Sequence, residues 1–355
     1  MKLCRFQYHN VVRTGCMVGD TIKPLDQLLP ERASDSVCRD MRALLTAGPA
    51  LLDEIRAGLA DNRGDTIRLA SVRLLAPIDN PSKIICAWVN YLNPAMAQLP
   101  ETPIFFAKFD SAIIGPGDAI RLPKAGGDIV VEPEMTVVIG KAGREIAEAD
   151  AMDHVGGYTI VNDVTAFSHR LQVLVGSIGP YMMAKTFDTF APMGPWLTTA
   201  DEIPEPHNLQ VSQFLNGKLM THANTREAVF KIPALISYLS NIFELRPGDL
   251  FDQGRQPGAG PVVGGVEIVG AVGVGVREVC DDREAPIPLA QTKIAADCVA
   301  DCAGTIESAE IVLNVGNLGG ILAWFQLYEH HIADHGDTVA APRDSWHGIL
   351  QMNYW

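Results

Sequence analysis

The sequence has few positive charges for its size, and this deficit excludes one class of partner. Its 355 residues include 28 Lys and Arg against 42 Asp and Glu, which gives a formal net charge of −14 at pH 7. So acidic a chain repels a phosphate backbone. We therefore expect no nucleic-acid partner.

Long apolar runs and an apolar leader are also missing. The longest apolar stretch, 262–276, is rich in glycine, contains Glu267 and falls short of the ~20 residues that a helix needs to span a bilayer. The first ten residues, MKLCRFQYHN, alternate apolar and polar side chains, unlike the apolar core of a secretory signal. We expect a soluble protein with no membrane partner.

Cysteine is sparse and its pattern is irregular. The seven cysteines are odd in number and show no regular spacing, so no disulfide framework is predicted. Cys298 and Cys302 lie four residues apart, but no second pair completes a zinc site. The composition is that of a reduced, cytoplasmic protein.

The order of predicted elements favours an α+β fold that is mostly β. Strand-like runs follow one another in the middle of the chain and do not alternate with helices, as they would in a doubly wound sheet. The expected strands are 2–8, 11–18, 84–89, 129–140, 158–161, 209–215 and 262–276, and the expected helices are 36–59, broken at Gly48-Pro49, and 230–243.

Three segments are predicted from these elements. They are a small N-terminal domain at 1–78, a catalytic domain at 79–287, and a helical C-terminal extension at 288–355 that packs on the body or on a dimer mate. Within the extension, His331 and His335 would share one face of a helix. Two ligands are too few for a metal site, and a helix end followed by Gly336 is the competing interpretation.

Two glutamates interrupt the apolar run at 129–140. Glu132 and Glu134 are two residues apart, and in a strand such residues point to the same face, about 6–7 Å apart along the chain. Buried carboxylates that lie side by side repel each other, and burial without a partner raises their pKa. A bound cation would remove both costs. Pro133 has no N–H, so this strand should be an edge, bulged or unpaired there.

A third acidic residue, Asp163, follows the strand-like run at 158–161. Three oxygen ligands with no His or Cys beside them suit a hard ion, Mg²⁺ or Mn²⁺, better than zinc. The competing interpretation is structural: Glu132 and Glu134 would form a solvated pair on an edge strand, and Asp163 would be an unrelated loop residue. Periodicity alone leaves both interpretations open.

At these residues the chain resembles the fumarylacetoacetate hydrolase family. The resemblance covers roughly residues 75–280, and each of its motifs is weak alone, whereas their order along the chain is specific. The matching segments are IICAWVNY at 84–91, PIFFAK at 103–108, the Glu-x-Glu strand ending in Ile139-Gly140, GYTIVND at 157–163, KTFD at 185–188, PMGP at 192–195, Asn216-Gly217 and LRPGDL at 245–250.

The resemblance implies a fold, a metal site and a substrate class. The fold is a mixed β-sandwich roll, commonly a homodimer. Glu132, Glu134 and Asp163 would bind Mg²⁺ (or Mn²⁺), and Lys185 would act near the substrate as a cation or proton donor, so Lys185 and Asp163 are the catalytic candidates. Candidate substrate-binding residues are Tyr91, Lys108, Arg170, Gln253, Gly254 and Arg255.

The chain also departs from the family pattern. Family hydrolases often carry, after the Asn-Tyr pair, a His–Glu dyad that activates water. Here Pro94 and Ala97 occupy those places, and neither can take a proton. Phe167 stands where the family has Arg, although Arg170 is close by, and the Gly-Thr-Pro loop reads GRQ at 254–256. The histidines considered as a substitute base are His154, His169 and His222.

A retained metal site without the dyad leaves three functional hypotheses. The first is a divalent-metal-dependent enzyme that cleaves a C–C bond of a 2-oxo acid or 1,3-dicarbonyl (acylpyruvate-like) substrate, by hydrolysis or decarboxylation, through a metal-stabilised enolate. The second is a tautomerase or isomerase, a dehydratase or a cyclising enzyme, since these reactions need only an electron sink and a proton shuttle. The third is a catalytically degenerate binding subunit.

Overall fold

The structure is a computed structural model that describes residues 1–91, 100–123, 128–167, 181–215, 218–254, 261–262, 274–275 and 349–351. Several predictions lie outside the described residues. They are the Arg170 and Arg255 contacts, His169, most of the expected strand at 262–276, and the helical extension apart from 349–351, which is a strand. All described residues belong to one compact unit. The division of the chain at 78 and 287 therefore stays a prediction.

The N-terminal residues fold into a β-meander followed by short helices. Strands at 2–8 and 11–18 are confirmed, and the predicted break at Gly48-Pro49 separates two helices, because Gly48 adopts a φ of +77° and Pro49 opens the second helix. The strands are β1 (Lys2–Tyr8), β2 (Val11–Val18), β3 (Thr21–Pro24), β4 (Ile67–Arg68) and β5 (Arg73–Leu75), and the helices are α1 (Leu25–Leu28), α2 (Met41–Ala47) and α3 (Pro49–Ala60).

The rest of the described chain is mostly β. Its strands are β6 (Ile84–Trp88), β7 (Ile104–Lys108), β8 (Ile113–Ile114), β9 (Ala119–Arg121), β10 (Asp128–Val130), β11 (Pro133–Ile139), β12 (Val155–Asn162), β13 (Thr165–Phe167), β14 (Ala191–Thr199), β15 (Gln210–Leu215), β16 (Lys218–Asn224), β17 (Leu250–Asp252), β18 (Pro261–Val262), β19 (Val274–Gly275) and β20 (Ile349–Gln351). Its helices are α5 (Tyr181–Lys185) and α6 (Ile232–Ile242).

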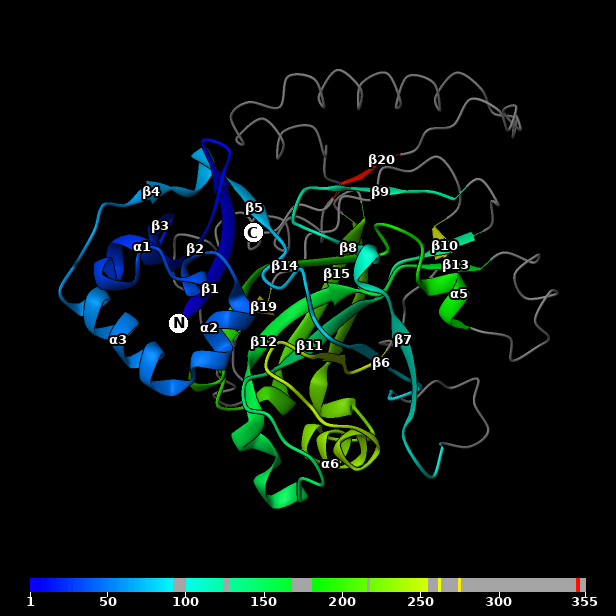
Figure 1. Cartoon of the computed structure of the whole chain (residues 1–355). Helices are drawn as coiled ribbons and strands as arrows, with labels where there is room; N and C mark the ends of the chain where they lie inside the picture. The colour runs from blue at the N-terminus through cyan, green and yellow to red at the C-terminus, as the bar shows by residue number, and fades with distance from the viewer. Residues whose placement is uncertain are drawn as a thin grey trace, which may run out of the picture. The chain divides into compact units, whose positions relative to one another are not determined.

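One large mixed sheet organises the described residues (Figure 1). Its order is β4-β3-β2-β1-β14-β12-β11-β17-β6-β7, with β5 paired to β1 and β8 paired to β14. The β17–β6 and β14–β8 pairs are parallel, and the other pairs in this sheet are antiparallel. The chain therefore has the expected α+β, mostly β architecture.

The run at 129–140 is not one strand. It divides into β10, which belongs to a separate small sheet, and β11, which lies inside the large sheet between β12 and β17. Of the three alternatives at Pro133, the edge strand is wrong, because β11 is interior. The unpaired alternative holds on one side, because β11 pairs with β17 only over 136–138 and Pro133 pairs with β12 alone. Pro133 is instead the first residue of an interior strand, a position where the missing N–H is tolerated.

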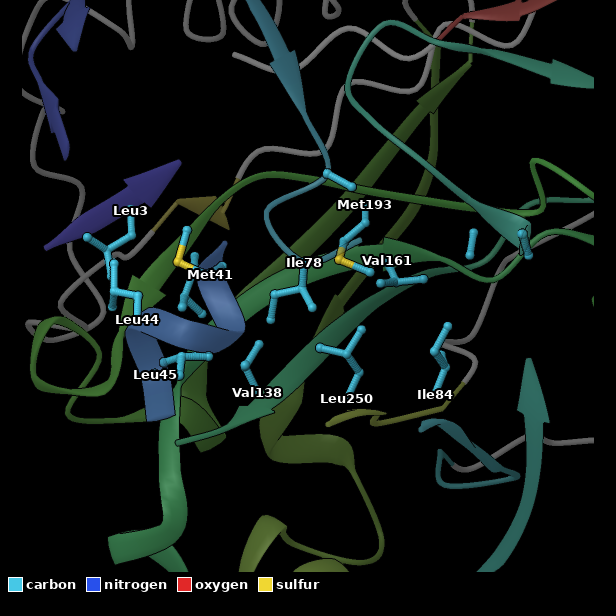
Figure 2. Packing of buried hydrophobic residues seen from close by; sticks show 14 of the residues in the cluster. Leu3, Met41, Leu44, Leu45, Ile78, Ile84, Val138, Val161, Met193 and Leu250 are labelled. Atoms are coloured by element: carbon cyan, nitrogen blue, oxygen red, sulfur yellow. The ribbon is translucent and has the colours of Figure 1, made fainter. Parts of the chain in front are cut away.

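The two faces of β11 pack against different helices. Val138 points into a core that contains Met41 and Leu44 of α2, as Figure 2 shows. Its neighbours Val137 and Ile139 point into a second core that contains α6. This strict alternation fixes the register of β11, because a slip by one residue would exchange the two faces. Among the described residues, no helix is long and apolar enough to cross a membrane.

Candidate active site

The three predicted acidic residues meet where β11 begins and β12 ends. Pro133 pairs with Asn162, which places Glu132 opposite Asp163. The Asp163 N–H donates to the Glu132 carbonyl at 2.8 Å, and the Glu132 N–H donates to Asn162 Oδ1 at 2.8 Å. One carboxylate oxygen each of Glu132, Glu134 and Asp163 then lies within 4.8 Å of the other two.

These carboxyl groups are removed from solvent. The exposed fractions are 2% for Glu132, 1% for Glu134 and 0% for Asp163. The interpretation of a solvated edge-strand pair with an unrelated loop aspartate is therefore wrong. Carboxylates this deeply buried need compensating charge nearby.

Two buried lysines supply part of that charge. Lys108 Nζ donates to Asp163 Oδ1 at 2.6 Å and to the Val164 carbonyl at 3.1 Å. Lys185 Nζ, at the end of α5, forms an ion pair with Asp163 Oδ2 and another with Glu132 Oε2 at 2.8 Å. Asp163 thus lies between two ammonium groups, and Lys185 bridges two of the three acidic residues. The Lys185 ammonium also lies 4.6 Å from the centroid of the Phe106 ring.

The lysines divide the carboxylates into two electrostatic classes. Burial disfavours ionised Asp163, but Lys108 and Lys185 outweigh that effect and lower its pKa. Burial raises the pKa of Glu134 well above its ordinary value, and the nearby Asp163, Asp252 and Glu132 raise it further. Burial acts against the charge of Lys185, yet Asp163 and Glu132 raise its pKa, so it stays an ammonium.

The donor set fits a hard divalent ion. All three groups offer oxygen, and two ligands of an octahedral Mg²⁺ at ~2.1 Å lie no more than about 4.2 Å apart, close to the spread of these oxygens. Burial and the neighbouring carboxylates disfavour the ionised form of Glu134, and a bound cation would offset both effects. Glu132, Glu134 and Asp163 are therefore the residues that would hold such an ion.

Gly254 helps to orient Glu134. Its N–H donates to Glu134 Oε2 at 2.7 Å. Glu134 is the one carboxylate of the three that forms no ion pair with a lysine of the described residues. Gly254 adopts a φ of +93°, and a Cβ there would lie 2.9 Å from the Ala87 carbonyl oxygen. The position therefore requires glycine.

Asn90 connects two of the predicted substrate-binding residues: Tyr91 follows it in the sequence, and Gln253 accepts a hydrogen bond from its side chain. The Asn90 side chain donates to the Gln253 carbonyl at 2.9 Å and to the Phe230 carbonyl at 3.1 Å, so it ties the end of β17 to the start of α6. Tyr91 is 2% exposed, and its backbone forms an isolated antiparallel β-bridge with Ala228. Gln253 is fully buried, and neither atom of its side-chain amide has a partner among the described residues.

One buried acidic residue of this region, Asp252, was not predicted. It ends β17, is 0% exposed, and accepts hydrogen bonds from the Thr136 hydroxyl and, at 3.2 Å, from the Cys86 thiol. Burial raises its pKa to about 7. The sequence signal for Asp252 is an acidic residue that ends a short apolar run, Leu250-Phe251-Asp252, two residues before the segment 254–256 that aligns with the family's Gly-Thr-Pro loop.

Of the two described histidines that were considered as a substitute base, His154 lies far from the cluster. His154 precedes β12, whereas Asp163 follows it, so nine residues of nearly continuous strand separate them by about 30 Å. The His154 ring contacts the Lys141 carbonyl at 2.9 Å. His222 is exposed on β16 and contacts Ser212.

Comparison with protein families agrees with this geometry. Residues 83–290 match the family described as fumarylacetoacetate (FAA) hydrolase C-terminal. The chain belongs to the fumarylacetoacetate hydrolase family. Residues 1–77 match a second family, described as Rv2993c-like, N-terminal.

Two relatives of this chain are named as oxaloacetate tautomerases. The chain is 43% identical over 226 residues to an oxaloacetate tautomerase fahd2, mitochondrial, of Xenopus laevis, covering 63% of this chain and 69% of that protein. It is 37% identical over 225 residues to the human oxaloacetate tautomerase FAHD2A, mitochondrial, covering 62% and 70%.

Solved structures of family members share the fold. A maleylpyruvate hydrolase from Sphingobium sp. SYK-6, in complex with manganese(II) ion and pyruvate, is 34% identical with a TM-score of 0.64, covering 78% of this chain and 96% of that one. A 5-carboxymethyl-2-hydroxymuconate delta-isomerase from Mycobacterium smegmatis is 30% identical with a TM-score of 0.61 and the same coverage. These neighbours and the relatives above are named as hydrolase, isomerase and tautomerases.

Proposed function

We propose that this family member is a divalent-metal-dependent tautomerase of a small 2-oxo acid, with a dicarboxylate such as oxaloacetate as the first candidate substrate. The observation that carries the proposal is the buried Glu132–Glu134–Asp163 cluster with the Lys185 ammonium bridging two of its members. We further propose that it acts as a cytoplasmic homodimer.

The chemistry follows from the charges at the site. A divalent ion held by the three carboxylates would supply Lewis-acid polarisation of an oxo acid. Lys185 is an ammonium, so it stabilises negative charge on a substrate oxygen. Lys108 keeps Asp163 ionised and oriented. Tyr91, Gln253 and Gly254, with Arg170 and Arg255, are the proposed substrate contacts.

The missing dyad favours tautomerisation over hydrolysis. Hydrolytic cleavage needs a water made nucleophilic on site, and Pro94 and Ala97 cannot do this. Moving a proton between carbon and oxygen needs a group that takes up and returns that proton, but it needs no nucleophilic water. The names of the two tautomerase relatives support the same choice.

C–C cleavage of an acylpyruvate-like substrate, by hydrolysis or decarboxylation, remains the second candidate. The observation that favours it is the structural likeness to a maleylpyruvate hydrolase that was solved with manganese and pyruvate. Both reactions would use the same cluster, so the products decide between them.

The decisive experiment follows oxaloacetate and an acylpyruvate with the purified chain and Mn²⁺. Tautomerisation gives faster enol–keto exchange at unchanged mass, decarboxylation releases CO₂ and pyruvate, and hydrolysis gives two acids. We expect accelerated exchange that chelation abolishes and that added Mn²⁺ restores in the wild type but not in Glu132→Ala. Full activity of that variant would contradict the proposal. Asp249→Asn, which alters a buried carboxyl bonded to Ser82 and Lys83, is the matched control and should remain active.

A further inference from the structure

Asp252 lies in a row of side chains that leads to the candidate metal site. Thr136 on β11, Asp252 on β17 and Cys86 on β6 are cross-strand partners, so their side chains share one face of the sheet. Two residues along the strands, the same face carries the apolar Val138, Leu250 and Ile84 that Figure 2 shows. In the other direction along β11 it carries Glu134.

The Asp252 carboxylate is fixed at both oxygens. Thr136 donates its hydroxyl to Oδ1, and Cys86 donates its thiol to Oδ2 at 3.2 Å. All three residues are 0% exposed. Among the described residues no lysine or arginine forms an ion pair with Asp252. A buried carboxylate held only by neutral donors lowers the stability of the fold, and an apolar residue at this position would give a more stable chain.

The backbone after Asp252 reaches a proposed metal ligand. The Gln253 N–H donates to the Met135 carbonyl at 3.2 Å, which continues the β17–β11 pairing, and the Gly254 N–H donates to Glu134 Oε2 at 2.7 Å. The Asp252 side chain therefore anchors the strand end from which Gly254 orients Glu134.

The charge of Asp252 also matters to the site. Among the described residues, Glu132, Glu134, Asp163 and Asp252 are four buried carboxyl groups of this region, and Lys108 and Lys185 are the buried ammonium groups paired with two of them. When all are ionised, two negative charges are left over, which one divalent cation neutralises. Without Asp252, the same cation would overcompensate the cluster.

We propose that Asp252 is a positioning residue of the metal site, which strengthens divalent-cation binding by adding negative charge behind Glu134 and by anchoring the Gly254 N–H on it. This inference rests on the metal site of the proposed function.

The test measures Mn²⁺ binding by calorimetry in Asp252→Asn, which removes the charge but keeps an oxygen for Thr136. We expect the dissociation constant to rise about tenfold, as for other residues that orient metal ligands. The electron paramagnetic resonance spectrum of bound Mn²⁺ should change as well, because the Glu134 contact is altered. A folded Asp252→Asn variant with the wild-type constant and spectrum would overturn the inference.

Two further variants separate positioning from general stability. Asp249→Asn makes the same substitution at a carboxyl that is also buried and adjoins β17, and it should melt earlier without changing Mn²⁺ binding. Thr136→Val keeps the Asp252 charge and removes one hydrogen bond to it, so it tests the inference even if Asp252→Asn does not fold. This variant should bind Mn²⁺ more weakly, and an unchanged dissociation constant would overturn the inference. A wild-type chain that binds no Mn²⁺ would instead overturn the proposed function itself.

Discussion

At the scale of single residues, Gln253 combines complete burial with an unpaired amide. Its Nε2 and Oε1 have no partner among the described residues, whereas the buried amide of Gln213 donates to the Val131 carbonyl at 3.2 Å. A buried polar group without a partner costs stability, and such costs persist where a ligand completes the hydrogen bonds. The contrast between the two glutamines gives a test.

Gln253→Met should move stability and substrate binding in opposite directions. Removing the unpaired amide should raise the free energy of unfolding by about 1 kcal/mol, because its desolvation cost disappears. The KM for the oxo acid should increase, because the amide no longer contacts the substrate. Thermal denaturation and steady-state kinetics check the two effects. In the control, Gln213→Met, stability should fall. A stabilised Gln253→Met with unchanged KM would show that the amide does not bind substrate.

At the scale of elements, the start of α6 depends on a residue distant in sequence. The His207 ring Nε2 accepts the Ile232 N–H at 3.2 Å, and Lys231, at the N-cap position, offers no side-chain cap. The ring can accept only when it is neutral. Burial lowers the pKa of His207 from its ordinary value of 6.5, and the neighbouring Lys231 lowers it further.

Replacing His207 should therefore alter both the stability of the chain and its dependence on pH. The loss of a helix cap in His207→Ala should cost about 1 kcal/mol near neutral pH. A histidine with a lowered pKa stabilises the fold above its unfolded pKa, and this contribution is lost as the pH falls through the folded value. Urea denaturation at several pH values should show a shallower decline for the variant on acidification. His222→Ala, at an exposed histidine, should change little, and equal effects of both variants would contradict the assignment.

Elements that depend on local pattern were predictable, and pairings between distant segments were not. The alternation at 2–8 indicated one strand and the Gly48-Pro49 break indicated two helices, because periodicity and turn residues act locally. The sequence does not reveal that β1 pairs with β14, nor that β11 is interior. Glu132 and Glu134 are two residues apart in one strand, so the sequence predicts that they lie close together. Asp252, Cys86 and Thr136 come from three strands, and only the pairing of those strands brings them together.

At the scale of the whole molecule, the buried charge couples the fold to pH and to divalent ions. Burial raises the pKa of Glu134 well above its ordinary value and that of Asp252 to about 7. A carboxyl group whose pKa is higher in the folded chain stabilises the fold below its unfolded pKa, and this contribution is lost as the pH rises through the folded value. Without a cation, these two groups therefore destabilise the chain at neutral and alkaline pH.

A divalent ion should reverse that loss, and it should do so more strongly at higher pH. Glu134 must be ionised to bind the ion, so binding releases protons and tightens as the pH rises. The rise in melting temperature on adding Mg²⁺, which grows with the ratio of ion concentration to Kd, should be larger at about pH 8 than at about pH 5.5, above and below the value for Asp252. In Glu134→Gln, the metal-free chain should depend less on pH and gain little from Mg²⁺ at either value, because a neutral amide needs no counter-charge. A wild-type shift that is equal at both pH values, or larger in acid, would mean that the ion binds without these carboxylates.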